Sequence, residues 1–139
     1  MSVVKELLRT EANDTLSFGN FELEQKTKLD SYEFKGDVYK VKTFKEITKL
    51  ERNGVFVYES VPGTTVTNFL EKDDYMTFLV EGTDDAQITV EAEDGAEYKV
   101  NIDGISVGKV KAEFGGKLVL SVELNPGVSR KVELKKILE

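Results

Sequence analysis

Beyond residue 84 the chain alternates apolar and polar residues with a period of two, and dipeptides typical of tight turns separate the alternating segments. The turn sequences are Asp94-Gly95, Asp103-Gly104, Gly115-Gly116 and Asn125-Pro126-Gly127. Asp-Gly and Gly-Gly supply the positive φ angles that two-residue type I′ hairpin turns require, and their twist matches that of the flanking strands. The pattern therefore predicts consecutive antiparallel strands in a meander.

Alternate side chains of a strand point to opposite faces of its sheet, so the apolar positions of these segments should share one core. These positions are Ile88, Val90 and Ala92; Tyr98, Val100 and Ile102; Val110, Ala112 and Phe114; and Leu118, Leu120, Val122 and Leu124. The positions between them form the expected solvated side of the sheet: Glu91, Glu93, Lys99, Asn101, Lys109, Lys111, Glu113, Ser121 and Glu123. A last strand over residues 128–137 repeats the pattern with Val132 and Leu134.

The N-terminal part has a more irregular β pattern, and two of its segments are compatible with either a strand or a helix. Residues 3–9 carry apolar side chains at positions 3, 4, 7 and 8, and residues 43–52 begin with Thr43 and Glu46, which could form a helix-capping box. Asn53-Gly54 follows the second segment and precedes a β-prone run, so its turn chemistry favours a hairpin there. The first segment stays open between the two.

A polar, glycine-containing stretch at residues 81–85 has the composition of a boundary between domains or sheets. The chain of 139 residues is long enough to bury a core without disulfides or metal. We therefore expect an all-β protein, an antiparallel meander or β-sandwich with two closely packed lobes at residues 1–82 and 83–139.

The chain has no histidine, cysteine or tryptophan, which removes the commonest side chains for proton transfer, nucleophilic attack and transition-metal binding. No nucleotide-binding, zinc-ribbon or hydrolase motif is present, so we expect no enzyme activity and no cofactor. The net charge of -7 disfavours nucleic acid as a partner. No apolar run is long enough for membrane insertion or for a signal peptide, and the absence of cysteine is compatible with the cytoplasm, which is the expected location.

Carboxylates are the one group here that could bind a metal, and calcium is the metal that they suit. The weak calcium candidates are Asp84, Asp85, Glu91, Glu93 and Asp94, none of them in a loop with the acid spacing of an EF-hand. Exposed aromatic rings could instead stack on a sugar. Tyr39, Tyr58 and Tyr98 follow the apolar period and are expected in the core, which leaves Tyr32 and Tyr75 as the weak ligand-binding candidates.

Charge is distributed unevenly along the second half of the chain. Residues 81–103 carry eight acids and one lysine, a net charge of -7, whereas residues 104–139 carry seven bases and four acids, a net charge of +3. This polarity would permit electrostatic head-to-tail association between copies. The alternative is that oppositely charged residues pair on neighbouring strands of one molecule.

Three segments, at residues 39–50, 57–64 and 115–118, resemble a small all-β protein of clostridia and their relatives that often carries the label endosialidase. The region around residues 98–104 also resembles the β-sandwich modules appended to bacterial surface and carbohydrate-active proteins. The chain has no Asp-box repeats, no arginine triad and too few residues for a propeller, so neither resemblance transfers catalytic residues to it.

Taken together, these observations favour a non-catalytic β module of a bacterium that self-assembles into a homo-oligomer or scaffolds other proteins. The opposed charged stretches and the edge strands of a meander support this function. A carbohydrate-binding module is the alternative, and a glycosidase that depends on two carboxylates is a more distant one.

Overall fold

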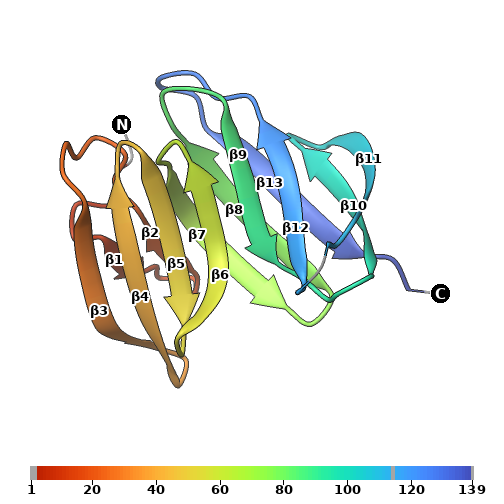
Figure 1. The fold of residues 1–139 in the computed structure, drawn as a ribbon, viewed down its shortest axis with the longest axis horizontal. Coiled ribbons are helices and arrows are strands. Elements are labelled where there is room, and N and C mark those ends of the chain that lie inside the picture. Colours follow the sequence, from red (N-terminus) through yellow and green to blue (C-terminus); the bar gives the residue numbers. More distant parts are fainter. Residues whose placement is uncertain (1–2, 114, 139) are drawn as a thin grey trace.

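The computed structural model describes residues 3–113 and 115–138, which form thirteen strands and no helix (Figure 1). The strands are β1 (Leu8–Thr10), β2 (Leu16–Phe18), β3 (Thr27–Phe34), β4 (Asp37–Phe44), β5 (Ile47–Arg52), β6 (Val55–Val61), β7 (Thr65–Lys72), β8 (Tyr75–Glu81), β9 (Ala86–Glu91), β10 (Glu97–Ile102), β11 (Ile105–Lys111), β12 (Lys117–Val122) and β13 (Arg130–Lys136). Within these ranges, therefore, no helix could cross a membrane.

The strands form two antiparallel sheets that pack face to face as a β-sandwich (Figure 1). Sheet A has the order β1-β2-β7-β8-β13-β10-β11, and sheet B has the order β12-β9-β6-β5-β4-β3. The predicted all-β, antiparallel sandwich class is confirmed. Burial alternates along strands such as β4, β10 and β12 because every second side chain enters the space between the sheets.

Two of the predicted turns close hairpins as expected. Asn53-Gly54 connects β5 to β6 with φ angles of 52° and 80°, and Asp103-Gly104 connects β10 to β11 with φ angles of 54° and 80°. Both residues of a type I′ turn need positive φ, which Asn-Gly and Asp-Gly tolerate well. The prediction of a hairpin rather than a helix over residues 43–52 is therefore confirmed.

The prediction of consecutive hairpins is wrong at the other three turns, because each of them carries the chain from one sheet to the other. Asp94-Gly95 leads from β9 to β10, Gly115-Gly116 from β11 to β12, and Asn125-Pro126-Gly127 from β12 to β13. The first two crossings run side by side. The amide of Ala92 donates to the carbonyl of Gly116 at 2.7 Å, and the amide of Ala112 donates to the carbonyl of Ala96 at 2.8 Å. The crossings thus satisfy each other's backbone groups without a hairpin.

Residues 3–9 form neither a helix nor one continuous strand. A turn closes between Val4 and Leu7, whose φ is 74°, and β1 begins directly after it. Of the apolar side chains that suggested a helix, Val4 and Leu8 are almost fully inaccessible to solvent, whereas Val3 and Leu7 are partly buried.

Each sheet combines strands from residues 1–82 with strands from residues 83–139. In sheet A, β8 pairs with β13, and in sheet B, β6 pairs with β9. The expected boundary at residues 82–83 falls in the connection between β8 and β9, where the chain passes from sheet A to sheet B. The predicted sheet junction is therefore present, whereas the division into two lobes stays a prediction.

The core lies between the sheets and contains the inward positions predicted for the C-terminal strands, from Ile88 to Leu124, except that Ala92, Ile102 and Val110 are partly buried and Phe114 lies outside the described residues. Its centre is a group of aromatic rings from both sheets. Phe18 contacts Tyr58 and Phe69 edge to face, with centroid distances of 5.2 and 5.7 Å, and Phe78 contacts Tyr58 at 5.7 Å. Such edge-to-face pairs add to the free energy gained from burying the rings.

A buried network of hydroxyl groups crosses one end of the sandwich. The Thr64 hydroxyl lies 2.8 Å from the Tyr58 hydroxyl and 2.7 Å from that of Ser60. The Thr48 hydroxyl donates to the Thr64 carbonyl at 2.7 Å and lies 2.8 Å from the hydroxyl of Thr43. No buried side-chain polar atom of the described residues lacks a partner.

Tyr58→Phe should lower the free energy of unfolding by about 1–2 kcal/mol, because it removes one member of a fully buried hydrogen-bond network. Urea denaturation of the wild type and the variant measures this difference. Tyr32→Phe is the matched control, because the Tyr32 hydroxyl bonds to Thr10 at an exposed position. An equal loss in both variants would contradict a special role for the buried network.

The contacts of Asp103, in the turn between β10 and β11, predict that the stability of the fold depends on pH. Hydrogen bonds from the backbone amide of Lys131 and from Arg130 lower the pKa of Asp103. A carboxylate with a lowered pKa stabilises the fold above its ordinary pKa, and this contribution disappears as the pH falls. Asp103→Asn should cost about 0.2–1 kcal/mol at pH 7, as expected of an exposed ion pair. The difference from the wild type should shrink in denaturation experiments below about pH 4.

Candidate functional site

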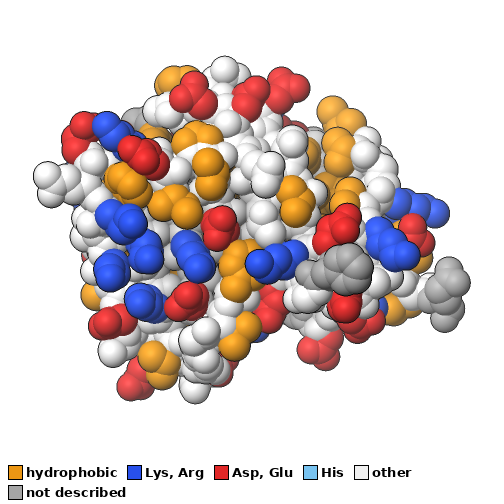
Figure 2. Space-filling model, viewed as in Figure 1, with side chains coloured by type: hydrophobic (Ala, Val, Ile, Leu, Met, Phe, Trp, Pro, Cys, Tyr) orange, Lys and Arg blue, Asp and Glu red, His pale blue; other side chains and the backbone are white. Residues whose placement is uncertain are grey.

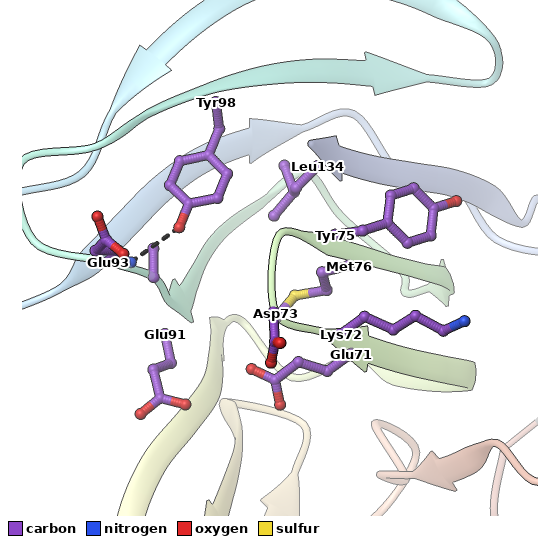
Figure 3. A pocket seen from close by; sticks show the side chains of 10 residues that line it. Glu71, Lys72, Asp73, Tyr75, Met76, Glu91, Glu93, Tyr98 and Leu134 are labelled. Atoms are coloured by element: carbon purple, nitrogen blue, oxygen red, sulfur yellow. Dashed lines mark hydrogen bonds between the residues drawn. The ribbon is translucent and has the colours of Figure 1, made fainter. Parts of the chain in front are cut away.

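A cleft of about 190 Å³ opens between the sheets at the end formed by the β7–β8 turn and the crossing from β9 to β10 (Figure 3). Four of its lining residues are acidic: Glu71, Asp73, Glu91 and Glu93. They come from both sheets, since β7 belongs to sheet A and β9 to sheet B.

Arg52, the last residue of β5, binds two of these carboxylates. Its Nη1 hydrogen-bonds to Glu71 of the opposite sheet, and its Nη2 donates to Oε1 of Glu91 at 2.9 Å. Partial burial opposes the charged guanidinium, but the hydrogen bond and the charge of Glu71 outweigh it and raise the pKa of Arg52. Arg52 thus holds two carboxylates as its counter-ions and connects the two sheets.

Tyr98 and Tyr75 line this cleft in different ways. Tyr98 is buried, as predicted, and its hydroxyl accepts a hydrogen bond from the amide of Glu93 at 2.9 Å. The ring of Tyr75 points away from the carboxylates of Glu71 and Glu91, in the same direction as Lys72 (Figure 3). Its hydroxyl donates to Glu133 at 3.2 Å. Tyr32, the other ligand-binding candidate, lies on β3 and bonds to Thr10 at 2.8 Å, away from the residues that line the cleft.

The structure does not bring the five calcium candidates together. Asp84 and Asp85 precede β9, whereas Glu91 is its last residue and Glu93 and Asp94 follow it. The two groups are therefore separated by the length of β9, about 20 Å. Asp85 accepts from the amide of Leu124, Glu91 binds Arg52 and Glu93 binds Lys136. Among the described residues, no group of three or more acidic side chains could hold a metal ion.

The acidic and basic stretches of the second half contact each other within one molecule. Arg130 binds Asp103 at 2.9 Å, and Lys136 binds Glu93 at 2.6 Å. These ion pairs fit the alternative in which opposite charges pair on neighbouring segments of one molecule. Head-to-tail association through the two stretches stays a prediction.

A second hollow, of about 310 Å³, lies along one side of the sandwich, where sheet A extends beyond sheet B. Sheet A ends with the β10–β11 hairpin and sheet B ends with β12. Ile102, Ile105 and Val107 of sheet A line this groove together with Ser121 and Glu123. Ile105 is 69% exposed and Val107 is 54% exposed. Figure 2 shows hydrophobic side chains at the surface in this region. We call this hollow the β11–β12 groove.

Sequence reasoning identified Tyr75 but missed Arg52, Ile105 and Val107. Arg52 ends a strand whose sequence pattern is ordinary, and only the packing of sheet A on sheet B brings Glu71 to it. Ile105 and Val107 match the alternation of a buried strand, but β12 is the last strand of sheet B and leaves them uncovered.

A comparison with protein-family models, curated proteins and solved structures gave no match for this chain.

Arg52→Met should lower the free energy of unfolding by about 1–3 kcal/mol, because it removes charge-assisted hydrogen bonds and leaves two partly buried carboxylates without their counter-ion. Arg52→Met combined with Glu71→Gln should recover part of the loss in a double-mutant cycle. Lys45→Met is the control, because its ion pair with Glu24 is exposed and should contribute at most about 0.5 kcal/mol. Additive losses in the cycle would contradict the coupling.

Proposed function

We propose that this protein is a non-catalytic interaction module that self-associates through the β11–β12 groove. The observation that carries the proposal is the combination of two exposed apolar side chains, Ile105 and Val107, with the neighbouring edge of β12. A β-strand placed along that edge would extend sheet B and cover the groove.

The backbone of β12 supports this mode of binding. Along Lys117–Val122, β12 pairs with β9 on one side, and it is the last strand of sheet B. On its other side Lys117 forms a bridge with Glu113, so the edge offered to an added strand begins at Leu118. An edge strand presents amide and carbonyl groups that can pair with an added strand, and pockets beside the edge then select its side chains. The groove supplies such a pocket, which is lined by the apolar Ile105 and Val107 and by the charged Glu123 and Arg130.

The state of the acidic residues also favours binding over catalysis. Hydrolysis by a carboxylate pair needs one group to act as an acid and the other as a base or nucleophile. Glu71 and Glu91 of the cleft are instead both bound to the guanidinium of Arg52. These two carboxylates are therefore better placed to join the sheets through Arg52 than to activate water.

Light scattering after size exclusion tests the proposal. The wild type should have a mass of at least twice 15.6 kDa and should keep it at about 0.5 M salt, because the groove is mainly apolar and screening affects mainly exposed charges. Val107→Lys should convert it to a monomer. Val38→Lys is the matched control, because Val38 is 46% exposed on the outer face of β4, away from the groove.

A wild type that stays at 15.6 kDa over a wide range of concentrations would overturn self-association. Loss of the oligomer in both lysine variants would show that added charge, rather than the groove, controls assembly.

A further inference from the structure

Four lysines and one tyrosine form a straight row across the outer face of sheet A. Lys109 of β11 lies opposite Lys99 of β10, and Lys99 lies opposite Lys135 of β13. Lys135 lies opposite Tyr75 of β8, which in turn lies opposite Lys72 of β7. Directly opposite residues share a face of the sheet. We call these five residues the lysine row; it crosses five strands and spans about 19 Å at an interstrand spacing of about 4.8 Å.

This arrangement opposes folding. Like charges directly opposite each other on neighbouring strands destabilise a sheet, and the row contains two such contacts, Lys109 with Lys99 and Lys99 with Lys135. No carboxylate of the described residues lies within 4.0 Å of any of its four ammonium groups. All four side chains are exposed, in a chain whose net charge is -7. A negatively charged ligand would relieve this repulsion.

Tyr75 gives the row an apolar element. Its ring is half-buried, its hydroxyl is held by Glu133, and it points to the same side as Lys72 (Figure 3). A tyrosine ring held in this way offers a flat apolar face with little conformational entropy to lose on binding. Flat rings of this kind stack on the apolar faces of sugars.

We propose that the lysine row binds a linear acidic polysaccharide, with its carboxylate or sulfate groups on the lysines and one sugar ring against Tyr75. The row is a line of positive charge, and acidic residues flank it: Glu97 lies two positions before Lys99, and Glu133 two positions before Lys135. A planar anionic membrane would meet these acids, whereas a single extended chain passes between them. Single-stranded nucleic acid is normally bound by several stacking rings, and the row has one.

The outer face of sheet B provides an internal comparison. Lys28, Lys42 and Lys49 lie opposite one another on β3, β4 and β5, where Figure 2 shows a group of basic side chains. Burial and the neighbouring lysines lower the pKa of Lys42. Lys49, however, contacts Glu51 at 3.7 Å, and the next position of the row is Glu59. This second row is shorter, partly neutralised and followed by an acid, so it serves as the control surface.

Isothermal titration at about 0.1 M salt, with a heparin oligosaccharide and an oligogalacturonate as probes, tests the proposal. The wild type should bind at least one of them, and its affinity should fall as salt rises. Lys99→Gln combined with Lys135→Gln should weaken binding by about tenfold or more, whereas Lys28→Gln combined with Lys42→Gln should leave it unchanged. Tyr75→Ala should weaken binding, and Tyr75→Phe should retain most of it.

The variant with Lys99→Gln and Lys135→Gln should also have a higher urea midpoint than the wild type, because the substitutions remove repulsion between like charges. A cooperative transition at that midpoint would show that the variant is folded. Failure of the wild type to bind either probe would overturn the proposal, as would equal losses in the two double variants. Tighter binding of an oligothymidylate or of phosphatidylserine vesicles through the same lysines would assign the row to nucleic acid or to membrane instead. The Val107→Lys variant should bind the oligosaccharide normally, so this proposal and self-association fail independently.

Discussion

The fold depends on a buried set of hydroxyl groups where the chain leaves sheet B for sheet A. Thr64 lies at the centre of this set, bonded to Tyr58 and Ser60 of β6 and to Thr48 of β5. A buried polar group without a partner is costly, so such a network stabilises one arrangement only when every member is satisfied. Nearby, a Cβ at Gly63 would overlap the carbonyl oxygen of Phe44. The crossing between the sheets therefore tolerates little displacement.

Because aromatic and aliphatic side chains fill the space between the sheets, the surfaces available to a partner are the ends, sides and outer faces of the sandwich. At the end that carries the cleft, Arg52 and its two carboxylates connect the sheets. One side is left open because sheet A has one strand more than sheet B. The proposed assembly and the proposed polysaccharide site use different parts of this surface, the groove beside β12 and the outer face of sheet A.

The net charge of the protein does not indicate where its charged residues lie. A protein with a net charge of -7 carries cross-strand rows of lysine on both outer faces, while many of its acids lie at turns and strand ends. Several of these acids have structural partners: Asp85 binds a backbone amide, Asp103 binds Arg130, and Glu93 binds Lys136. The four lysines of the lysine row have no carboxylate within 4.0 Å among the described residues. Residues that oppose stability without a structural role are good candidates for function.

The sequence by itself determined the local structure. Period-two alternation placed Lys99 and Lys109 on the solvated side and Val100 and Leu120 in the core, and Asn53-Gly54 and Asp103-Gly104 closed hairpins, because these properties depend on neighbouring residues along the chain. The tertiary structure decided which strands pair. The same kind of turn closes a hairpin at Asp103-Gly104 and changes sheet at Asp94-Gly95, because the difference lies in distant partners for β9 and β10. The register of β13 against β10 and β8, which aligns Lys135 with Lys99 and Tyr75, depends on the same long-range pairing. Tyr75 could therefore be named from the sequence, but the lysine row, the contacts of Arg52 and the exposure of Val107 could not.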